Sequence, residues 1–328
     1  LAEEAAFDAS LTTYSRALAM RSIGEMRPAG VLERVAAEVI GDEARWPPKL
    51  LFSIVEILYP AFLTIADLEA LIRRTPEPPQ TVGGFSWALF NVAHSIPAHS
   101  AQATELRDLL ARAIWEGRTP ESNWYQLHSQ FGYLAGALLK VCARQLEAGA
   151  TFDENLCWAS VVGHRFGEVG TLGRDEARSI RAAIPAAGPS RRFLFDAELR
   201  FMETIAATAE ASERLYYAHR HGSLTQLSAS DWDWLVTALN ETAPGMRRDA
   251  YFHAAIDLWF TRGRLADEFV VLEALARENE AWGRVLTHQT TPQKRNPTWE
   301  QHEKEQAEKP SQCNFSKRRN LHLQVKCI

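Results

Sequence analysis

The spacing of apolar residues constrains the fold of this chain more than any other feature. Apolar side chains recur three and four residues apart along almost the whole sequence, and no long stretch alternates between apolar and polar residues. That spacing places apolar side chains on one face of an α-helix, whereas a half-buried strand needs alternation. Breaks in the pattern fall close to proline or glycine, as in short connections between antiparallel helices. The sequence therefore predicts an all-α protein.

Several helices can be placed from this pattern. Apolar stripes at 32–39 and 50–58 each follow prolines, which fit a helix start because the missing N–H breaks no helical hydrogen bond there. A longer pattern from Pro120 to Leu146 predicts the longest helix of the chain. Another helix is expected to start at Thr151, three residues before Glu154, because this is the spacing of a capping box. Further helices are expected at 174–184, 190–206, 209–219, 230–239, 246–262 and 265–286.

Two segments far apart share one pattern. The stretch LTIADLEALI at 63–72 matches LSASDWDWLV at 227–236, and both place a hydroxyl three residues before an aspartate, which predicts a helix N-cap. Each copy is followed by a proline break and an aromatic-rich helix. The repeated unit, a helix pair of about 33 residues, has the size of stacked helical repeats. We therefore expect antiparallel helix pairs stacked as an α-solenoid, a superhelix of the HEAT or TPR kind.

Length and charge suggest the domain organisation. The 328 residues exceed one ordinary compact domain, so we expect a helical-repeat array over 1–286, with a sub-boundary near 184–190. The polar, proline-broken residues 287–328 predict a charged helix and a flexible basic tail. The chain carries a net charge of −5, and its last 42 residues contain eight basic and four acidic side chains, which leaves −9 on the array.

Motifs for chemistry are missing from the sequence. It contains no phosphate-binding G-x-x-x-x-G-K-[ST] loop, and its four cysteines are too far apart for a C-x-x-C metal site. We therefore predict no catalytic residues, cofactor or metal. No apolar run is long enough to span a bilayer, and the few cysteines favour a reducing cytoplasm. An acidic array argues against nucleic-acid binding except through the basic tail, where Lys317, Arg318 and Arg319 form a cluster.

Two tryptophans are the best candidates for exposed anchors that bind a partner. Trp46 precedes two prolines, and Trp234 lies two residues from Trp232, so neither is easily buried with its neighbours. Most other tryptophans fall in apolar stripes and are expected to pack between helices. These are Trp87, Trp115, Trp124, Trp158, Trp232 and Trp259.

Residues 60–290 resemble the helical-repeat sensor region of large bacterial NTPases of the STAND or NACHT type. The segments that carry the resemblance are LTIADLEAL, HSQFGYLAGALLKVCARQL and HGSLTQLSASDWDWLVTALNETAPGMRRDAYFHAAIDLW. In that family the repeats recognise a foreign or stress-derived ligand, and a separate P-loop domain drives signalling. This chain has no P-loop, so the resemblance implies only a sensor or scaffold role, in bacterial signalling or antiphage defence.

We therefore expect a non-enzymatic module for protein–protein interaction or ligand sensing, with a protein partner or proteinaceous ligand. One alternative is a compact all-helical enzyme whose site is built from scattered residues such as His128, His164 and Glu168. Another is nucleic-acid binding through the basic tail, which a steep loss of binding with salt would reveal.

Overall fold

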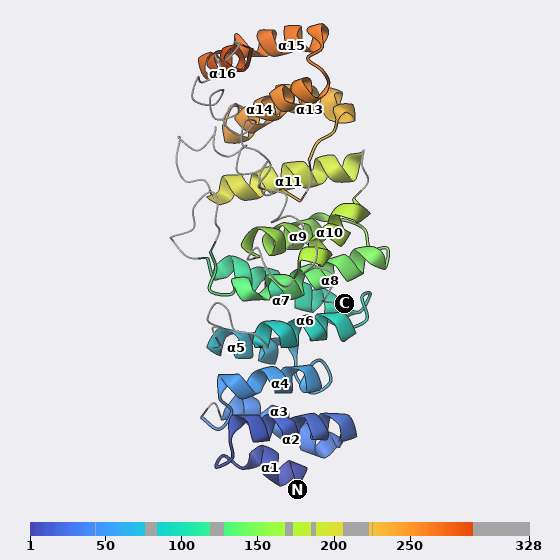
Figure 1. The fold of residues 1–328 in the computed structure, drawn as a ribbon, viewed down its shortest axis with the longest axis vertical. Helices are drawn as coiled ribbons and strands as arrows, with labels where there is room; N and C mark the ends of the chain where they lie inside the picture. The colour runs from blue at the N-terminus through green and yellow to red at the C-terminus, as the bar shows by residue number, and fades with distance from the viewer. Residues whose placement is uncertain are drawn as a thin grey trace, which may run out of the picture. The chain divides into compact units, whose positions relative to one another are not determined.

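The computed structural model describes residues 1–42, 44–75, 84–118, 128–167, 173–184, 188–205, 223–224 and 226–290. Within these ranges every regular element is helical, and the one β-type pairing is an isolated antiparallel bridge between Arg118 and Ser129 (Figure 1). The prediction of an all-α fold is confirmed. None of the helices in these ranges is long and apolar enough to cross a lipid bilayer.

The chain divides into two compact units. The boundary falls between Glu268 and Phe269, and the predicted limits at 286 and near 184–190 stay predictions. In chain order the α-helices are α1 (Ala2–Phe7), α2 (Thr13–Met26), α3 (Ala29–Gly41), α4 (Pro48–Leu58), α5 (Ile65–Arg74), α6 (Phe85–Ser95), α7 (Ala101–Glu116), α8 (Ala135–Glu147), α9 (Glu154–Phe166), α10 (Arg174–Ala183), α11 (Pro189–Ile205), α13 (Trp232–Glu241), α14 (Met246–Thr261), α15 (Ala266–Ala276) and α16 (Glu280–Thr290). Two 3₁₀ turns, η1 (Gly132–Leu134) and η2 (Ala229–Asp231), precede α8 and α13.

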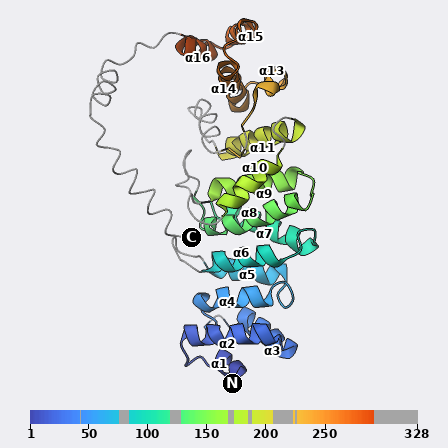
Figure 2. The same ribbon diagram turned by 45° about the vertical axis from the view of Figure 1, so that its right-hand side comes forward.

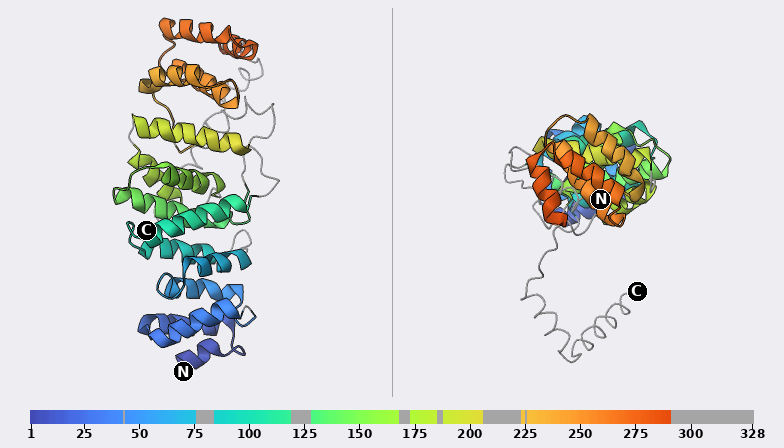
Figure 3. Two further views of the ribbon diagram at one scale, coloured as in Figure 1. Left: turned by 180° about the vertical axis from the view of Figure 1, so that it is seen from behind. Right: turned by 90° about the horizontal axis from the view of Figure 1, so that it is seen from above.

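Helices in the first unit pack against the helix two places further along the chain. One series of contacts joins α2 to α4, α4 to α6 and α6 to α8, and a second joins α3 to α5, α5 to α7 and α7 to α9. Figure 2 shows α2, α4 and α6 one above another, and the rear view in Figure 3 shows the blue to green helices of the first unit from the other side. Consecutive helices therefore alternate between two series, as in stacked helix pairs. Whether the stack forms a superhelix stays a prediction.

Apolar stripes supply the core between these helices. The predicted stripes on α3 and α4 are buried, and so is the stripe of α7, which packs against α5, α8 and α9. Their buried members include Leu32, Val35, Val39, Leu50, Leu51, Ile54, Leu58, Leu106, Leu110 and Ile114. Since each buried leucine or isoleucine contributes about 1.5–3 kcal/mol relative to exposure, this packing holds the stack together.

The prediction of one long helix from Pro120 to Leu146 is wrong. Residues 119–127 lie outside the described residues, but residues 128–131 are not helical, and α8 has only 13 residues. The Ser129 hydroxyl donates to the Ile114 carbonyl at 2.7 Å, and the Gln130 N–H donates to the Gly117 carbonyl at 3.0 Å. These bonds tie the segment to the end of α7 and compete with a helical ladder.

Two other helix boundaries differ from expectation. The cap of α9 is Asp153, whose carboxylate accepts the Leu156 N–H at 2.8 Å, so the expected Thr151 capping box is not formed. Aspartate is as good a cap as threonine, and here it lies next to the first helical residue. The single helix expected at 265–286 is two helices, because the Asn279 side chain accepts the Ala281 N–H at 2.9 Å and caps α16. The helix expected at 209–219 lies outside the described residues.

The two matching segments have the same local geometry. The Thr64 backbone N–H and hydroxyl both donate to one carboxylate oxygen of Asp67, at 2.9 and 2.7 Å. The Ser228 N–H and hydroxyl donate to one oxygen of Asp231 in the same way, at 2.9 and 3.2 Å. Thr64 is the N-cap of α5, and Ser228 is the N-cap of η2, which leads into α13. The predicted capping role of both segments is confirmed.

Replacing Thr64 with alanine should lower the free energy of unfolding by about 1 kcal/mol, because the Asp67 N–H, which donates to the Thr64 hydroxyl at 3.2 Å, loses its acceptor. Urea titration followed by circular dichroism measures the change. Thr64→Ser keeps the hydroxyl and should restore most of the loss. Equal stabilities for the alanine and serine variants would show that the cap does not stabilise α5.

Candidate functional site

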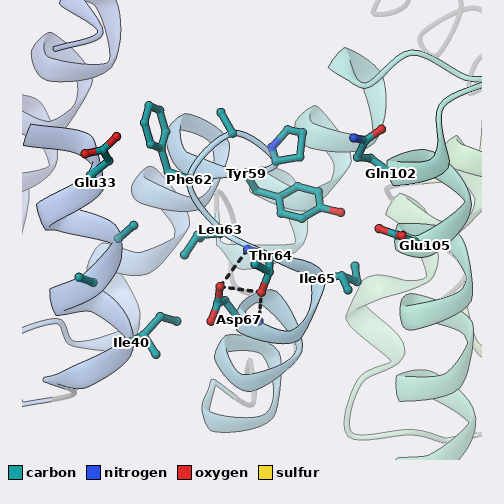
Figure 4. A pocket seen from close by; sticks show the side chains of 14 residues that line it. Glu33, Ile40, Tyr59, Phe62, Leu63, Thr64, Ile65, Asp67, Gln102 and Glu105 are labelled. Carbon is teal, nitrogen blue, oxygen red and sulfur yellow. Dashed lines mark hydrogen bonds between the residues drawn. The ribbon is translucent and has the colours of Figure 1, made fainter. Parts of the chain in front are cut away.

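A pocket opens between α3, the connection from α4 to α5, and the start of α7 (Figure 4). Its volume is about 800 Å³, within the usual range of ligand pockets. We call it the acidic pocket. Its lining comprises Glu33, Ala36, Ala37 and Ile40 from α3, the connection Tyr59, Pro60, Ala61, Phe62, Leu63 and Thr64, Ile65 and Asp67 from α5, and Gln102 and Glu105 from α7.

The connection between α4 and α5 forms the wall between the two outer helices. The Tyr59 N–H donates to the Val55 carbonyl at 2.9 Å, and the Phe62 N–H donates to the Leu58 carbonyl at 2.7 Å, so the chain turns tightly after α4. Leu63 is 3% exposed and holds the other end against the core, ahead of the Thr64 cap. Between these fixed ends the Phe62 side chain is half-buried and lines the pocket.

Three carboxylates line the acidic pocket, and no lysine or arginine does so among the described residues. Asp67 is held by the Thr64 cap. Glu33 on α3 and Glu105 on α7 lie on opposite sides of the pocket (Figure 4), and neither makes a hydrogen bond or ion pair with a residue that the structure describes. The pocket therefore carries negative charge that the described chain leaves unbalanced.

Tyr59 places a phenol in the acidic pocket. Its side chain is only 6% exposed, and its hydroxyl points toward the α7 side, where Glu105 lies (Figure 4). Within the described ranges the hydroxyl has no hydrogen-bond partner. Burial, and then the nearby Glu105 carboxylate, raises the pKa of Tyr59 to about 12, so the phenol is protonated at neutral pH. The ring is buried but the hydroxyl faces the pocket, where it can both donate to and accept from a ligand.

A second pocket, of about 750 Å³, lies between α2, α4 and α6, the other contact series. Trp87 lines it and is 42% exposed, so the expectation that Trp87 is a core residue is wrong. Phe85 and Leu89 form the buried stripe of α6, and a residue two positions after Phe85 points away from that stripe. The lining contains both basic and acidic side chains, and its Glu56 already accepts a hydrogen bond from Asn91 at 2.6 Å.

Trp46 was expected to be exposed, and this is wrong. Its side chain is 0% exposed. The Phe7 ring packs edge-on against it with centroids 5.7 Å apart, and the Arg16 guanidinium lies 4.8 Å from its ring centroid. The preceding α1 and α2 therefore cover the indole, a long-range contact that the neighbouring prolines do not indicate.

Trp234 is half-buried on α13. Its ring lies edge-on to Phe195 and Tyr251, with centroids 6.3 and 6.1 Å away, and the Arg192 guanidinium is 5.9 Å from its centroid. These neighbours cover part of the indole. Whether the exposed remainder binds a partner stays a prediction.

Asp231 combines its capping role with a buried ion cluster. The carboxylate is 0% exposed and pairs with Arg191 and Arg192 of α11, the latter at 2.9 Å. Burial by itself raises the pKa of Asp231, but the Ser228 N–H and the two guanidinium groups outweigh it and lower the pKa below its ordinary value. The cluster joins α11 to the start of α13.

The residues named for an alternative enzyme site are only partly described. His128 is exposed before η1, and the His164 ring nitrogen lies 3.3 Å from the Arg181 guanidinium. Glu168 and the basic cluster Lys317, Arg318 and Arg319 lie outside the described residues. In the part of the chain that is described, no three His, Cys, Asp or Glu side chains are grouped as metal ligands.

The fold and the pocket together define the class of this protein. It is an all-α protein whose helices pack alternately in two series and form an acidic pocket. The residues of this pocket were missed at the sequence level, although the stretch YPAFLT between two helices offers one signal, since it places two aromatics in a short connection. Searches among protein-family models, curated proteins and solved structures gave no match to this chain.

Proposed function

We propose that this chain is a non-enzymatic helical-repeat module that binds a protein partner, and that the acidic pocket is its recognition site. The observation that carries the proposal is Tyr59, a phenol 94% buried whose hydroxyl meets an open pocket instead of an internal partner. The ring is packed into the core, so the hydroxyl is held in place at the pocket. A ligand that hydrogen-bonds to this hydroxyl would complete the site.

The arrangement of helices supports a binding role. Stacked helix pairs offer long surfaces to protein partners, and the pocket spans three elements of one such stack. The resemblance of residues 60–290 to sensor regions of STAND and NACHT NTPases points the same way. It extends the proposal to a place in a bacterial signalling or defence NTPase, whose nucleotide chemistry would belong to other sequence. A cytoplasmic location is part of the proposal, since Cys142 and Cys157 are free thiols.

The polar groups of the pocket suit binding better than general base catalysis. A phenol with a pKa near 12 is a poor base at neutral pH. Asp67 is committed to the Thr64 cap. The two remaining carboxylates, on Glu33 and Glu105, stand on opposite sides of the pocket (Figure 4), where they can hold a ligand from both sides.

A capture experiment with matched variants tests this function. The immobilised chain is incubated with bacterial lysate, and bound proteins are quantified by mass spectrometry. Phe62→Ala removes an aromatic contact in the acidic pocket, and Trp87→Ala removes one from the second pocket. We expect a partner that the wild type and Trp87→Ala retain and that Phe62→Ala retains about tenfold less, followed by saturable binding of the purified partner in calorimetry. If no retained protein depends on Phe62, the acidic pocket is not a recognition site.

A further inference from the structure

We propose that the acidic pocket binds an arginine side chain presented by an extended segment of the protein partner. This inference rests on the proposed function and names the chemistry of the partner. It starts from the charge of the pocket, since Glu33, Asp67 and Glu105 line it without any lysine or arginine among the described lining residues. The complementary ligand is a cation.

Carboxylates on neighbouring surfaces of the same unit are paired within the chain. Glu69 accepts from Arg73 and Arg112, each at distances of 2.7 to 2.8 Å, and Glu38 pairs with Arg45 at 3.0 Å. Glu33 and Glu105 have no such pair in the described ranges. An unpaired carboxylate on an open surface is ordinary, but these two face one pocket that also holds the unpartnered Tyr59 hydroxyl. The Tyr59 hydroxyl distinguishes this pocket from a chance cluster of acidic residues.

The combination of groups favours arginine over lysine. A guanidinium has five N–H donors in a plane, so it can pair with a carboxylate and donate to a phenol oxygen at the same time. Its flat face also stacks on aromatic rings, and Tyr59 and Phe62 supply two. The chain itself packs guanidinium groups this way, with Arg34 3.8 Å from the Phe7 centroid and Arg118 3.4 Å from that of Trp115.

The apolar lining accounts for the rest of the side chain. Ile40 is 37% exposed and stands with Ala37 on the α3 side of the pocket, where the aliphatic stem of an arginine can lie. A free small cation would use the carboxylates but leave these apolar contacts unused. The pocket opens at the surface of the chain, where a side chain can enter from an extended peptide.

A phage-displayed library of random seven-residue peptides tests the inference. The library is selected on the full chain, and a selected peptide is then synthesised with a fluorescent label for anisotropy titrations. We expect arginine to be enriched among selected peptides, and replacement of that arginine by citrulline, its neutral isostere, to weaken binding about tenfold. Lysine in its place should weaken binding about threefold or more.

Variants of the chain locate the contact. Glu33→Gln and Glu105→Gln are each expected to weaken the arginine peptide about fivefold, and Tyr59→Phe about threefold. Glu25→Gln removes an exposed carboxylate at the second pocket and should leave binding unchanged. Circular dichroism melting of each variant separates lost binding from lost folding.

The outcomes distinguish the two proposals. Selected peptides that lose affinity with Phe62→Ala but show no arginine enrichment, or that bind equally well with lysine or citrulline, would overturn the arginine assignment and leave the recognition site in place. Peptides that bind without dependence on Phe62, or a selection that yields no peptide, would overturn both.

Discussion

Replacing Asp231 with asparagine is expected to lower the free energy of unfolding of the segment that holds α11 and α13 by about 3–5 kcal/mol. The carboxylate is fully buried, and Arg191, which is 5% exposed, is paired with it. An amide cannot balance this guanidinium, so the substitution leaves a buried charge without its counter-ion. The Ser228 N–H also loses a charged acceptor at the start of η2.

Hydrogen–deuterium exchange is the suitable measurement, because stacked helices can unfold locally. Faster exchange is expected in peptides from 189–205 and 232–241, with little change in α2 to α4. Asp233→Asn is the matched control, since Asp233 is exposed two residues away. A loss below about 1 kcal/mol for Asp231→Asn, the range of an exposed ion pair, would mean that this ion cluster does not stabilise the contact between the two helices.

Asp231 should also make this segment sensitive to acid. Its pKa is lower in the folded chain than in the unfolded chain, because Ser228, Arg192 and Arg191 outweigh the effect of burial. A carboxylate with a depressed pKa stabilises the fold fully at neutral pH, and this stabilisation is lost as the pH falls from about 4 through the folded pKa. In the Asp231→Asn variant, the protection of peptides 189–205 and 232–241 against hydrogen–deuterium exchange should depend less on pH below about 4.

Replacing Trp46 with alanine is expected to destabilise α1 and α2 by about 3–5 kcal/mol. The indole is fully buried, contacts Phe7 and lies under the Arg16 guanidinium. Its N–H has no hydrogen-bond partner in the described ranges. The loss therefore comes from packing and from the cavity left behind. Trp46→Phe, which keeps an aromatic ring and breaks no hydrogen bond, should cost much less.

Trp87→Ala is the matched control for Trp46→Ala. The substitution is the same, but Trp87 is 42% exposed, so we expect a loss of about 1 kcal/mol or less. Urea unfolding followed by circular dichroism and hydrogen–deuterium exchange gives both values. Similar losses for the two variants would contradict the burial that distinguishes these two tryptophans.

The periodicity of apolar residues was enough to predict an all-α fold and most helix positions. The stripe at 50–58 became the buried face of α4, and the hydroxyl–aspartate pattern became the caps at Thr64 and Ser228. Both signals act within one or two helical turns, so neighbouring residues suffice to specify them. The same logic failed at 128–131, where bonds from Ser129 and Gln130 to the end of α7 decide the backbone.

Exposure of single aromatics was decided by tertiary structure. The sequence put Trp87 in the core and Trp46 on the surface, and the reverse is true. Periodicity says which side of a helix is apolar, but whether another helix covers a given side chain depends on contacts with distant residues. Phe7 and Arg16, which cover Trp46, lie 30 or more positions before it.

By itself the sequence determined most of the helices, the caps at Thr64 and Ser228 and the acidic balance of the array, because each of these depends on local order or on composition. Only the tertiary structure decided where a site lies. Glu33, Tyr59 and Glu105 are separated by dozens of residues, and they line one pocket because α3, α5 and α7 pack in a single contact series. The unpartnered Tyr59 hydroxyl is likewise a property of its surroundings, since burial and the position of its neighbours, not its identity, leave it facing the pocket.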